Sequence, residues 1–398
     1  FGTESFDDLY TSYESDGSVP RKTIGAQELF LDILKERAET GRLYIMNIDH
    51  CNSHSSFLDK VEMSNLCQEI TLPTKPLEHI DDPNGEIALC ILSAVNVGKI
   101  RDLDDLKVLC DLAVRSLDEL IDFQNYPINA AEIATKARRS LGIGFIGLAH
   151  YLAKNGHDYN DPEAWQLVHN LTETFQYYLI SATVDLAEEK GACEYSGRTK
   201  YGNGILPIDT YKHDVDEIVP NDLHYDWEDL RLRVKKHGVR NSTLSAQMPS
   251  ESSSVVSNAT NGIEPPRGYL SIKKSKKGPL KQIVPQYATL KNNYTLLWDM
   301  GSNRGYINIV AVMQKFFDQA ISGNWSYNPL QYPDNEVPIS VMAQDLLTTY
   351  KYGWKTSYYQ NTYDFKTDEV DETDKESLEN LIAQLENAEE EECESCKI

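Results

Sequence analysis

The residues best suited to chemistry lie in the segment 63–70, where Asn65, Cys67 and Glu69 occupy alternate positions. In an extended chain, alternate side chains point to the same face. An amide, a thiol and a carboxylate would then share one pocket, with the carboxylate within reach as a general base. From the spacing alone, a surface loop with an incidental cysteine is the commoner explanation.

The other cysteines have simpler interpretations. Cys90 lies in the apolar, strand-like run 87–97, where a free cysteine usually behaves as a small core residue. Cys51 and Cys110 are assigned to the core by default, and nothing in the sequence marks Cys193. Seven scattered cysteines do not form the pattern of a secreted disulfide framework. No histidine is spaced near them as in a zinc site, so no metal is expected.

A second candidate site is the hydroxyl-rich turn at residues 248–254. In front of a helix, such a turn offers free backbone N–H groups and hydroxyls to a phosphate. The turn comprises Met248, Pro249, Ser250, Glu251, Ser252, Ser253 and Ser254. The alternative is an ordinary helix cap that pairs Ser250 with Ser253 or Ser254. The run 258–266, NATNGIEPP, is dense in turn formers and predicts an ordered loop.

Two residue pairs near the C-terminus complete the set. Tyr358 and Tyr359 are adjacent, and phenols that lose an electron and a proton together can form a redox relay, although packing is the commoner role in a chain with 23 tyrosines. Cys393 and Cys396 form a C-x-x-C pair in an acidic tail. Two ligands are too few for a structural zinc, and the tail offers no thioredoxin-like helix. A flexible dithiol that carries reducing equivalents fits this pair best.

The elements around these residues alternate between helices and buried strands, which predicts an α/β fold with largely parallel strands. Helices are predicted at 24–40, 103–123 and 161–190, and strands at 43–48, 87–97 and 204–208. Gly41 and Gly191 mark helix ends, and Asp161 followed by Pro162 marks a helix start.

Composition narrows the class of protein. The chain has 398 residues and a formal net charge of −24, so no nucleic-acid binding is expected. No apolar run reaches the length of a membrane span and no signal peptide opens the chain, so no membrane contact and a cytoplasmic location are expected. The chain begins at Phe1, which is consistent with a trimmed product or a fragment. Residues 364–398 contain 14 acidic residues and three lysines, which predicts a mobile tail.

Taken in order along the chain, these segments resemble the large subunit of aerobic class I ribonucleotide reductase. The segments are NLCQE at 65–69, the apolar run with Cys90, PSESS at 249–253, SNATNGIEPP at 257–266, the tyrosine pair and the C-terminal dithiol. Each is moderately specific, whereas the ordered set is highly specific and covers nearly the whole chain. The resemblance implies a ten-stranded α/β barrel of two five-stranded parallel halves with an internal finger loop at about 50–75. The barrel part would be 1–363 and the flexible redox tail 364–398.

The resemblance also implies a role for each active-site residue. Cys67 matches the cysteine that becomes a thiyl radical and takes the 3′ hydrogen from the ribose. Glu69 matches the base for the 3′-hydroxyl, and Asn65 matches the amide that binds the substrate and assists loss of the 2′ water. Cys90 matches one of the two cysteines that reduce the ribose and end as a disulfide. Residues 249–253 match the loop that holds the substrate diphosphate.

Electron transfer is implied by the same resemblance. Tyr359 and Tyr358 match the tyrosines that pass the radical to Cys67 from a small subunit with a diiron-tyrosyl centre. Cys393 and Cys396 match the tail pair that re-reduces the active site and is then reduced by thioredoxin or glutaredoxin. No cofactor is expected to bind this chain directly, and the nucleotide effectors would bind mainly outside it.

Length is the main departure from the family, whose chains are about twice as long. The partner of Cys90, most of the first half-barrel and the effector sites would lie in an N-terminal part. The expectation is therefore one polypeptide of a split, phage-like large subunit, in the cytoplasm of a bacterial or phage-infected cell, that needs a complementary N-terminal polypeptide. The alternative is an inactive remnant or structural subunit. The C-x-x-C spacing of the tail is also tighter than the spacing common in bacterial members.

Other classes fit less well. A cobalamin-dependent reductase shares the barrel and the cysteines but has no use for the tyrosine pair. A glycyl-radical enzyme would need a radical glycine near its C-terminus. A Cys–His hydrolase would need a histidine linked to Cys67.

Overall fold

The computed structural model describes residues 4–275 and 278–364, together with residue 380. Three long helices lie where the sequence predicts them: α2 (Ala26–Thr40), α4 (Asp105–Phe123) and α7 (Pro162–Lys190). Helix α2 ends because Gly41 adopts a left-handed φ of 68°, and its N–H donates to the carbonyl of Arg37. Helix α7 begins with Pro162, whose missing N–H costs nothing at this position.

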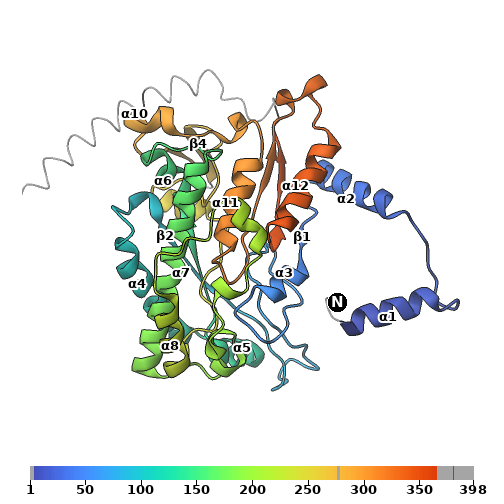
Figure 1. The fold of residues 1–398 in the computed structure, drawn as a ribbon, viewed down its shortest axis with the longest axis vertical. Helices are drawn as coiled ribbons and strands as arrows, with labels where there is room; N and C mark the ends of the chain where they lie inside the picture. The colour runs from blue at the N-terminus through green and yellow to red at the C-terminus, as the bar shows by residue number, and fades with distance from the viewer. Residues whose placement is uncertain (1–3, 276–277, 365–379, 381–398) are drawn as a thin grey trace, which may run out of the picture.

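The other helices are shorter. They are α1 (Glu4–Ser15), α3 (Ile48–Ser53), α5 (Asn129–Arg138), α6 (Leu148–Lys154), α8 (Trp227–His237), α9 (Glu251–Val256), α10 (Tyr287–Leu290), α11 (Arg304–Gln314) and α12 (Ile339–Lys351). Short 3-10 helices lie at Val97–Lys99, Ser196–Arg198, Tyr201–Asn203, Pro207–Asp209, His213–Glu217, Lys291–Asn293, Leu297–Asp299, Pro329–Gln331 and Pro333–Asn335. Helix α1 projects from the body of the molecule, whereas α2 lies beside α12 (Figure 1).

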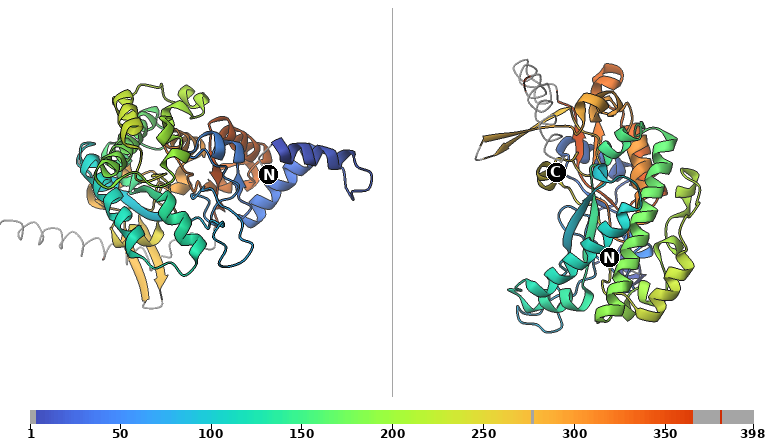
Figure 2. Two further views of the ribbon diagram at one scale, coloured as in Figure 1. Left: turned by 90° about the horizontal axis from the view of Figure 1, so that it is seen from below. Right: turned by 90° about the vertical axis from the view of Figure 1, so that its left-hand side faces the viewer.

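The strands pair two by two. They are β1 (Ile45–Met46), β2 (Ile91–Asn96), β3 (Leu141–Ile146), β4 (Leu270–Ser275), β5 (Gly278–Ile283), β6 (Trp325–Tyr327), β7 (Thr356–Ser357) and β8 (Gln360–Thr362). The pairs β2–β3 and β6–β8 are parallel, and the pairs β1–β7 and β4–β5 are antiparallel. The β4–β5 hairpin projects from the body (Figure 2).

A longer parallel ladder runs through segments too irregular to count as strands. Ile143 of β3 forms a parallel bridge with Ser245, and Gln247 forms one with Ile321. The N–H of Tyr358 then donates to the carbonyl of Gly323. Five extended segments therefore follow one another as β2, β3, 245–247, 319–323 and 356–360. The α/β class with parallel strands is confirmed, but the described residues form no closed sheet and show no ten-stranded barrel.

The core lies between this ladder and the helices. Phe145 of β3 packs against Phe175 of α7 and Phe317, with ring centroids 4.5 and 5.7 Å apart. Helix α7 in turn contacts α4 and α11 along its length (Figure 1). No helix in the described ranges combines the length and apolar character needed to cross a membrane.

Two strand predictions need correction. Residues 204–208 are not a strand, because Pro207 opens a 3-10 helix and the Asp209 carboxylate accepts the N–H of Leu206 at 2.8 Å. The predicted strand 43–48 shrinks to β1, since α3 already begins at Ile48. The run 87–97 becomes regular only at β2, so Cys90 lies just before the strand.

Candidate functional site

The segment around Cys67 is a tight turn and not the extended chain that the alternating residues predict. Gln68 has a left-handed φ of 66°, and its N–H donates to the Asn65 carbonyl at 3.2 Å. The Asn65 side chain is exposed and its Oδ1 accepts the N–H of Ile70 at 3.1 Å. The turn therefore separates Asn65 from Glu69, which is buried. The first part of the predicted loop 50–75 is helical, because α3 ends only at Ser53.

Glu69 is held by a distant segment of the chain. Its carbonyl accepts the N–H of Ala320 at 3.0 Å. The Ser322 hydroxyl lies 3.1 Å from the Glu69 carboxylate oxygen Oε2 and 2.5 Å from the carbonyl oxygen of Cys67. Residues 319–322 thus fix the two ends of the turn that carries the thiol and the carboxylate.

The same segment contacts the second thiol. The Gln319 amide nitrogen lies 3.7 Å from the Cys90 sulfur and donates to the Leu141 carbonyl at 2.8 Å. Burial raises the pKa of the Cys90 thiol well above its usual range, and the nearby carboxylates of Asp318 and Glu69 raise it further. Cys90 therefore keeps its proton at neutral pH, which is the form that can give up a hydrogen.

Tyr358 contacts Cys67, and Tyr359 contacts Tyr358. The Tyr358 hydroxyl donates to the Cys67 sulfur at 3.4 Å, and the rings of Tyr358 and Tyr359 have centroids 4.1 Å apart. Tyr44, which the sequence does not single out, lies 4.7 Å from Tyr358 and 5.3 Å from Tyr359 by the same measure. Burial and the contact with Cys67 raise the pKa of Tyr358, whereas hydrogen bonds from Tyr358 and Tyr44 lower the pKa of Tyr359. Three phenols and a thiol thus form one continuous chain of redox-capable groups.

Two buried cations hold the backbone of this tyrosine segment. The Arg37 guanidinium donates to the Tyr358 carbonyl at 2.8 Å and lies over the Trp325 ring, and burial lowers its pKa to about 10. The Lys355 ammonium donates to the carbonyls of Phe317, Asp318 and Gln319 at 2.8–3.1 Å. Lys355 therefore ties the strand that carries the tyrosines to the segment that contacts Cys90 and Glu69.

The hydroxyl-rich turn lies at a different wall of the site. Helix α9 begins after Ser250, whose hydroxyl donates to the Met248 carbonyl and makes no cap hydrogen bond. The Ser253 hydroxyl donates to the Ser250 carbonyl, so the predicted alternative of an ordinary capping box is wrong. Pro249 and Ser252 are in the same turn, at the start of α9.

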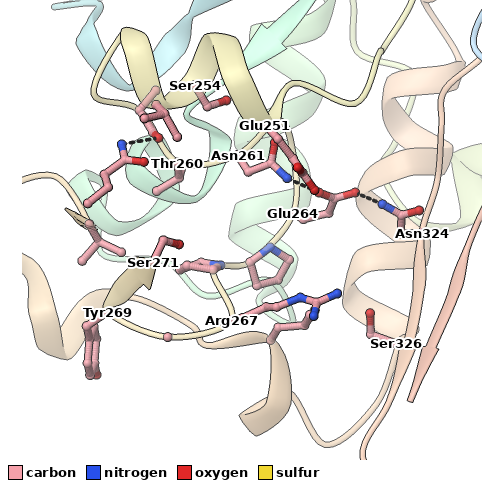
Figure 3. Close-up of a pocket in the computed structure, with 18 of the residues that line it drawn as sticks. Glu251, Ser254, Thr260, Asn261, Glu264, Arg267, Tyr269, Ser271, Asn324 and Ser326 are labelled. Atoms are coloured by element: carbon pink, nitrogen blue, oxygen red, sulfur yellow. Dashed lines mark hydrogen bonds between the residues drawn. The ribbon is translucent and has the colours of Figure 1, made fainter. Parts of the chain in front are cut away.

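A cavity of about 570 Å³ opens beside α9 (Figure 3). Glu251 and Ser254 line it on one side, the loop 259–269 and the β4–β5 hairpin on others, and Tyr359 closes one end. Glu264 points into it and accepts hydrogen bonds from the amides of Asn261 and Asn324 (Figure 3). Burial raises the pKa of Glu264 to about 7.

The structure brings together Cys67, Glu69, Cys90, Tyr358 and Tyr359. It places Glu251 on the cavity wall and leaves Asn65 exposed on the turn. Cys393 and Cys396 lie outside the described residues. The residues that sequence reasoning missed are Tyr44, Arg37, Gln319, Ser322 and Lys355. In the described ranges, no group of three or more His, Cys, Asp or Glu residues is arranged to hold a metal ion.

The comparisons with known proteins agree with this geometry. The model of the family "Ribonucleotide reductase, barrel domain" matches residues 1–293 and 286–360. The chain belongs to the ribonucleotide reductase barrel-domain family. This places the thiol, the carboxylate and the tyrosine pair in a fold known for ribonucleotide reduction.

Named relatives of the family support the assignment. The ribonucleoside-diphosphate reductase subunit alpha of Haemophilus influenzae is 57% identical over 92% of the chain and 49% of its own length. The ribonucleoside-diphosphate reductase 1 subunit alpha of Escherichia coli is 53% identical over 92% of the chain and 49% of its own length. The alpha subunit of Enterobacteria phage T4 is 40% identical over 99% of the chain and 51% of its own length. The chain therefore spans about half the length of the curated relatives that it matches.

Proposed function

We propose that this chain is the catalytic part of a class I ribonucleoside-diphosphate reductase and reduces ribonucleotides to deoxyribonucleotides by thiyl-radical chemistry. The observation that carries the proposal is the 3.4 Å contact between the Tyr358 hydroxyl and the Cys67 sulfur. A tyrosine that touches a thiol can exchange a hydrogen atom with it. Glu69, which is buried, and Cys90, which is half-buried, lie beside the same segment and supply a base and a reductant.

The radical step balances within these residues. Tyr359 gives an electron and a proton to a radical on a small subunit that carries a diiron-tyrosyl centre, and Tyr358 then gives an electron and a proton to the Tyr359 radical. The Tyr358 oxygen radical then takes the hydrogen of the Cys67 thiol, which leaves tyrosine and a thiyl radical. Because burial raises the pKa of Tyr358, no phenolate is present at neutral pH and the proton must leave with the electron.

The substrate step uses the other residues. The Cys67 radical takes the 3′ hydrogen of the ribose while Glu69 takes the proton of the 3′-hydroxyl. Asn65 contacts the substrate once the complementary N-terminal polypeptide covers the Cys67 turn, and residues 249–253 hold the diphosphate. Cys90 and a partner thiol from the N-terminal part of a large subunit provide two hydrogens and become a disulfide. One of these hydrogens leaves in water with the 2′-hydroxyl and the other ends on the 2′ carbon, after which Cys67 returns the 3′ hydrogen. In this proposal both parts together form the ten-stranded barrel, with the turn of Cys67 as its finger loop.

The remaining partners follow from this chemistry. A complementary N-terminal polypeptide supplies the partner thiol and the effector sites. Cys393 and Cys396 of the tail, residues 364–398, reduce the active-site disulfide and are themselves reduced by thioredoxin or glutaredoxin. Relatives from bacteria and a phage support a location in the cytoplasm of a bacterial or phage-infected cell.

Reconstitution tests the proposal. The chain alone should show no reductase activity, and mixing it with a complementary N-terminal polypeptide and a radical-bearing small subunit should restore turnover. A Cys67→Ser version of the mixture is the control and should form no product. An inactive mixture in which all three parts bind one another would instead favour the alternative of an inactive, structural subunit.

The tail is tested in the same mixture. The double variant Cys393→Ser/Cys396→Ser should complete one round from pre-reduced active-site thiols and then stall with thioredoxin or glutaredoxin. A small dithiol that diffuses into the site should partly restore turnover. Normal steady-state turnover by the double variant would show that another group carries the electrons.

A further inference from the structure

The Ser322 hydroxyl occupies a position that the proposed reaction does not yet use. The side chain is 4% exposed and lies on the extended segment 319–322. Its N–H donates to the Gln247 carbonyl at 3.0 Å, and the Gln247 N–H donates to the Ala320 carbonyl at 3.1 Å. The Gln247 side chain is itself bonded to both the N–H and the carbonyl of Phe145. The hydroxyl is therefore held by a rigid framework that reaches back to β3.

One hydroxyl proton faces two acceptors at this point. The Cys67 carbonyl oxygen lies 2.5 Å from the Ser322 oxygen, and the Glu69 Oε2 atom lies 3.1 Å from it. A serine hydroxyl has a single proton to donate but can also accept a hydrogen bond. Over the described residues, no other side chain hydrogen-bonds the Glu69 carboxylate and none forms an ion pair with it. Ser322 is thus the side chain that contacts this carboxylate directly.

The two acceptors flank a strained residue. Gln68 lies between Cys67 and Glu69 with a φ of 66°, a conformation that costs a residue with a side chain on the order of 1 kcal/mol. The serine hydroxyl bridges from one side of this residue to the other. The same hydroxyl therefore stabilises the strained turn and fixes the spacing between the thiol and the carboxylate.

We propose that Ser322 is a positioning residue that couples the protonation of Glu69 to the backbone of the Cys67 turn. The inference rests on the proposed function, in which Glu69 is the base. While Glu69 is a carboxylate, the serine proton is attracted to it, since a charged acceptor forms the stronger hydrogen bond. When Glu69 takes a proton from a substrate hydroxyl, its new O–H donates to the Ser322 oxygen and the serine proton turns to the Cys67 carbonyl. The proton stays on Glu69 throughout, and Ser322 neither gains nor loses one.

The coupling has a use in the reaction. Proton transfer to Glu69 strengthens the hydrogen bond to the Cys67 carbonyl, so the turn is held most firmly when the radical acts on the substrate. A hydroxyl that only packed the turn would stabilise it equally in both states. The pH dependence of the rate therefore separates coupling from packing.

The test compares Ser322→Ala, Ser322→Thr and the wild-type chain in the enzyme reconstituted with the complementary polypeptide and the small subunit. Loss of a hydrogen bond to a charged group should lower kcat about tenfold to a hundredfold, with KM for the ribonucleoside diphosphate nearly unchanged. The acid limb of the kcat/KM profile should move to higher pH, because the carboxylate loses its donor. Ser322→Thr keeps the hydroxyl and should restore both the rate and the profile.

A matched control is available at Ser140, another buried serine, whose hydroxyl lies 3.2 Å from that of Ser242 and hydrogen-bonds neither Cys67 nor Glu69. Ser140→Ala should change thermal stability alone. If Ser322→Ala leaves the pH profile in place and lowers kcat only in step with the folded fraction, the coupling is wrong and the serine is structural. If the wild-type enzyme is active and Ser322→Ala has the same rate and pH profile, this inference is overturned but the proposed function is not.

A second measurement does not depend on turnover. Difference infrared spectra can follow the carboxylate band of Glu69 in the wild-type chain, with Glu69→Gln to assign it. The midpoint of this titration should rise in Ser322→Ala and return in Ser322→Thr. An unchanged midpoint in Ser322→Ala would overturn the coupling, whether or not the reconstituted enzyme is active. An inactive reconstituted enzyme would count separately against the proposed function.

Discussion

Two sides of the site are built in different ways. The radical side consists of Cys67, Glu69, Cys90, Tyr358 and the segment 319–322, and its groups are mostly buried and fixed by distant parts of the chain. The cavity side consists of α9, the loop 259–269 and the β4–β5 hairpin, which surround an open space of about 570 Å³. Most of its polar groups come from residues 251–282, and Arg42, Asn324 and Asn361 add others from distant parts of the chain.

The difference teaches how the two tasks are divided. Hydrogen-atom transfer needs fixed distances, and the radical side obtains them from main-chain carbonyls bonded to buried Arg37, Lys355 and Ser322. Ligand binding needs access, and the cavity side provides it with an open space between loops. We therefore expect substitutions on the radical side to have large effects on rate or stability and substitutions on the cavity side to have small effects on affinity.

The largest effect is expected from Tyr358→Phe. The change removes the hydroxyl that contacts the Cys67 sulfur, and phenylalanine cannot carry the radical at an accessible potential. Turnover of the reconstituted enzyme should be abolished, as it should be for Tyr359→Phe. The melting temperature should hardly move, because one weak hydrogen bond contributes about 1 kcal/mol or less. Tyr151→Phe, at another buried tyrosine, is the control and should keep full activity. Near-normal turnover by Tyr358→Phe or Tyr359→Phe would show that these two tyrosines are packing residues.

The next effect concerns Lys355→Met. The variant leaves the Asp318 carbonyl without its side-chain donor, whereas the carbonyls of Phe317 and Gln319 keep the Gln314 amide, so the free energy of unfolding should fall by about 2 kcal/mol. Urea denaturation measures this change, with Lys60→Met at an exposed position as the control. Equal midpoints for the two variants would show that the ammonium does not hold the segment 317–319.

A moderate effect is expected from pH at His54. Its ring is buried and bonded to the Gln314 carbonyl and the Thr210 hydroxyl, and burial lowers its pKa well below 6.5. Below pH 6.5 the unfolded chain therefore binds a proton that the folded chain does not, so stability falls as the pH falls. The slope from this residue should approach 1.4 kcal/mol per pH unit, about the value of one proton. His54→Gln should flatten the slope between pH 5 and 6.5, and an unchanged slope would exclude His54 as its source.

The smallest effect is expected on the cavity side, at Glu264. Because the pKa of Glu264 is raised to about 7, the carboxyl is mostly neutral at pH 6 and mostly charged at pH 8. A charged carboxylate in the cavity repels a diphosphate, so the affinity of the reconstituted enzyme for ribonucleoside diphosphate should be a few-fold (~3-fold) weaker at pH 8. Glu264→Gln should remove this difference, whereas Glu163→Gln at an exposed site should keep it. Equilibrium binding that is insensitive to pH in the wild type would place the diphosphate away from Glu264.

Local signals in the sequence predicted the long helices well. The apolar stripes of α2, α4 and α7, with glycine or proline at the ends of α2 and α7, determine these helices without help from the rest of the chain. The strand prediction at 204–208 failed because Pro207 and Asp209 favour a 3-10 turn over an extended chain.

The candidate site was predictable only in part. The thiols and the tyrosine pair stand out by residue type, but the left-handed Gln68 that shapes the turn does not. Ser322 and Arg37 escaped notice because serine and arginine are common residues and no local pattern marks them. Their partners lie 255 and 321 residues away, so their roles exist only in the folded chain.

The contact between Arg37 and Tyr358 also sets an order for folding. These residues are separated by 321 positions, and β1 pairs with β7 over a similar span. A ribosome needs on the order of tens of seconds to synthesise that length. During this time the Cys67 turn can pack against segments that have already been made, but Tyr358 and Tyr359 have not yet been synthesised. The contact between Cys67 and the tyrosine pair, which is the radical route in the proposed function, is therefore completed last, when nearly all of the folded domain has been made.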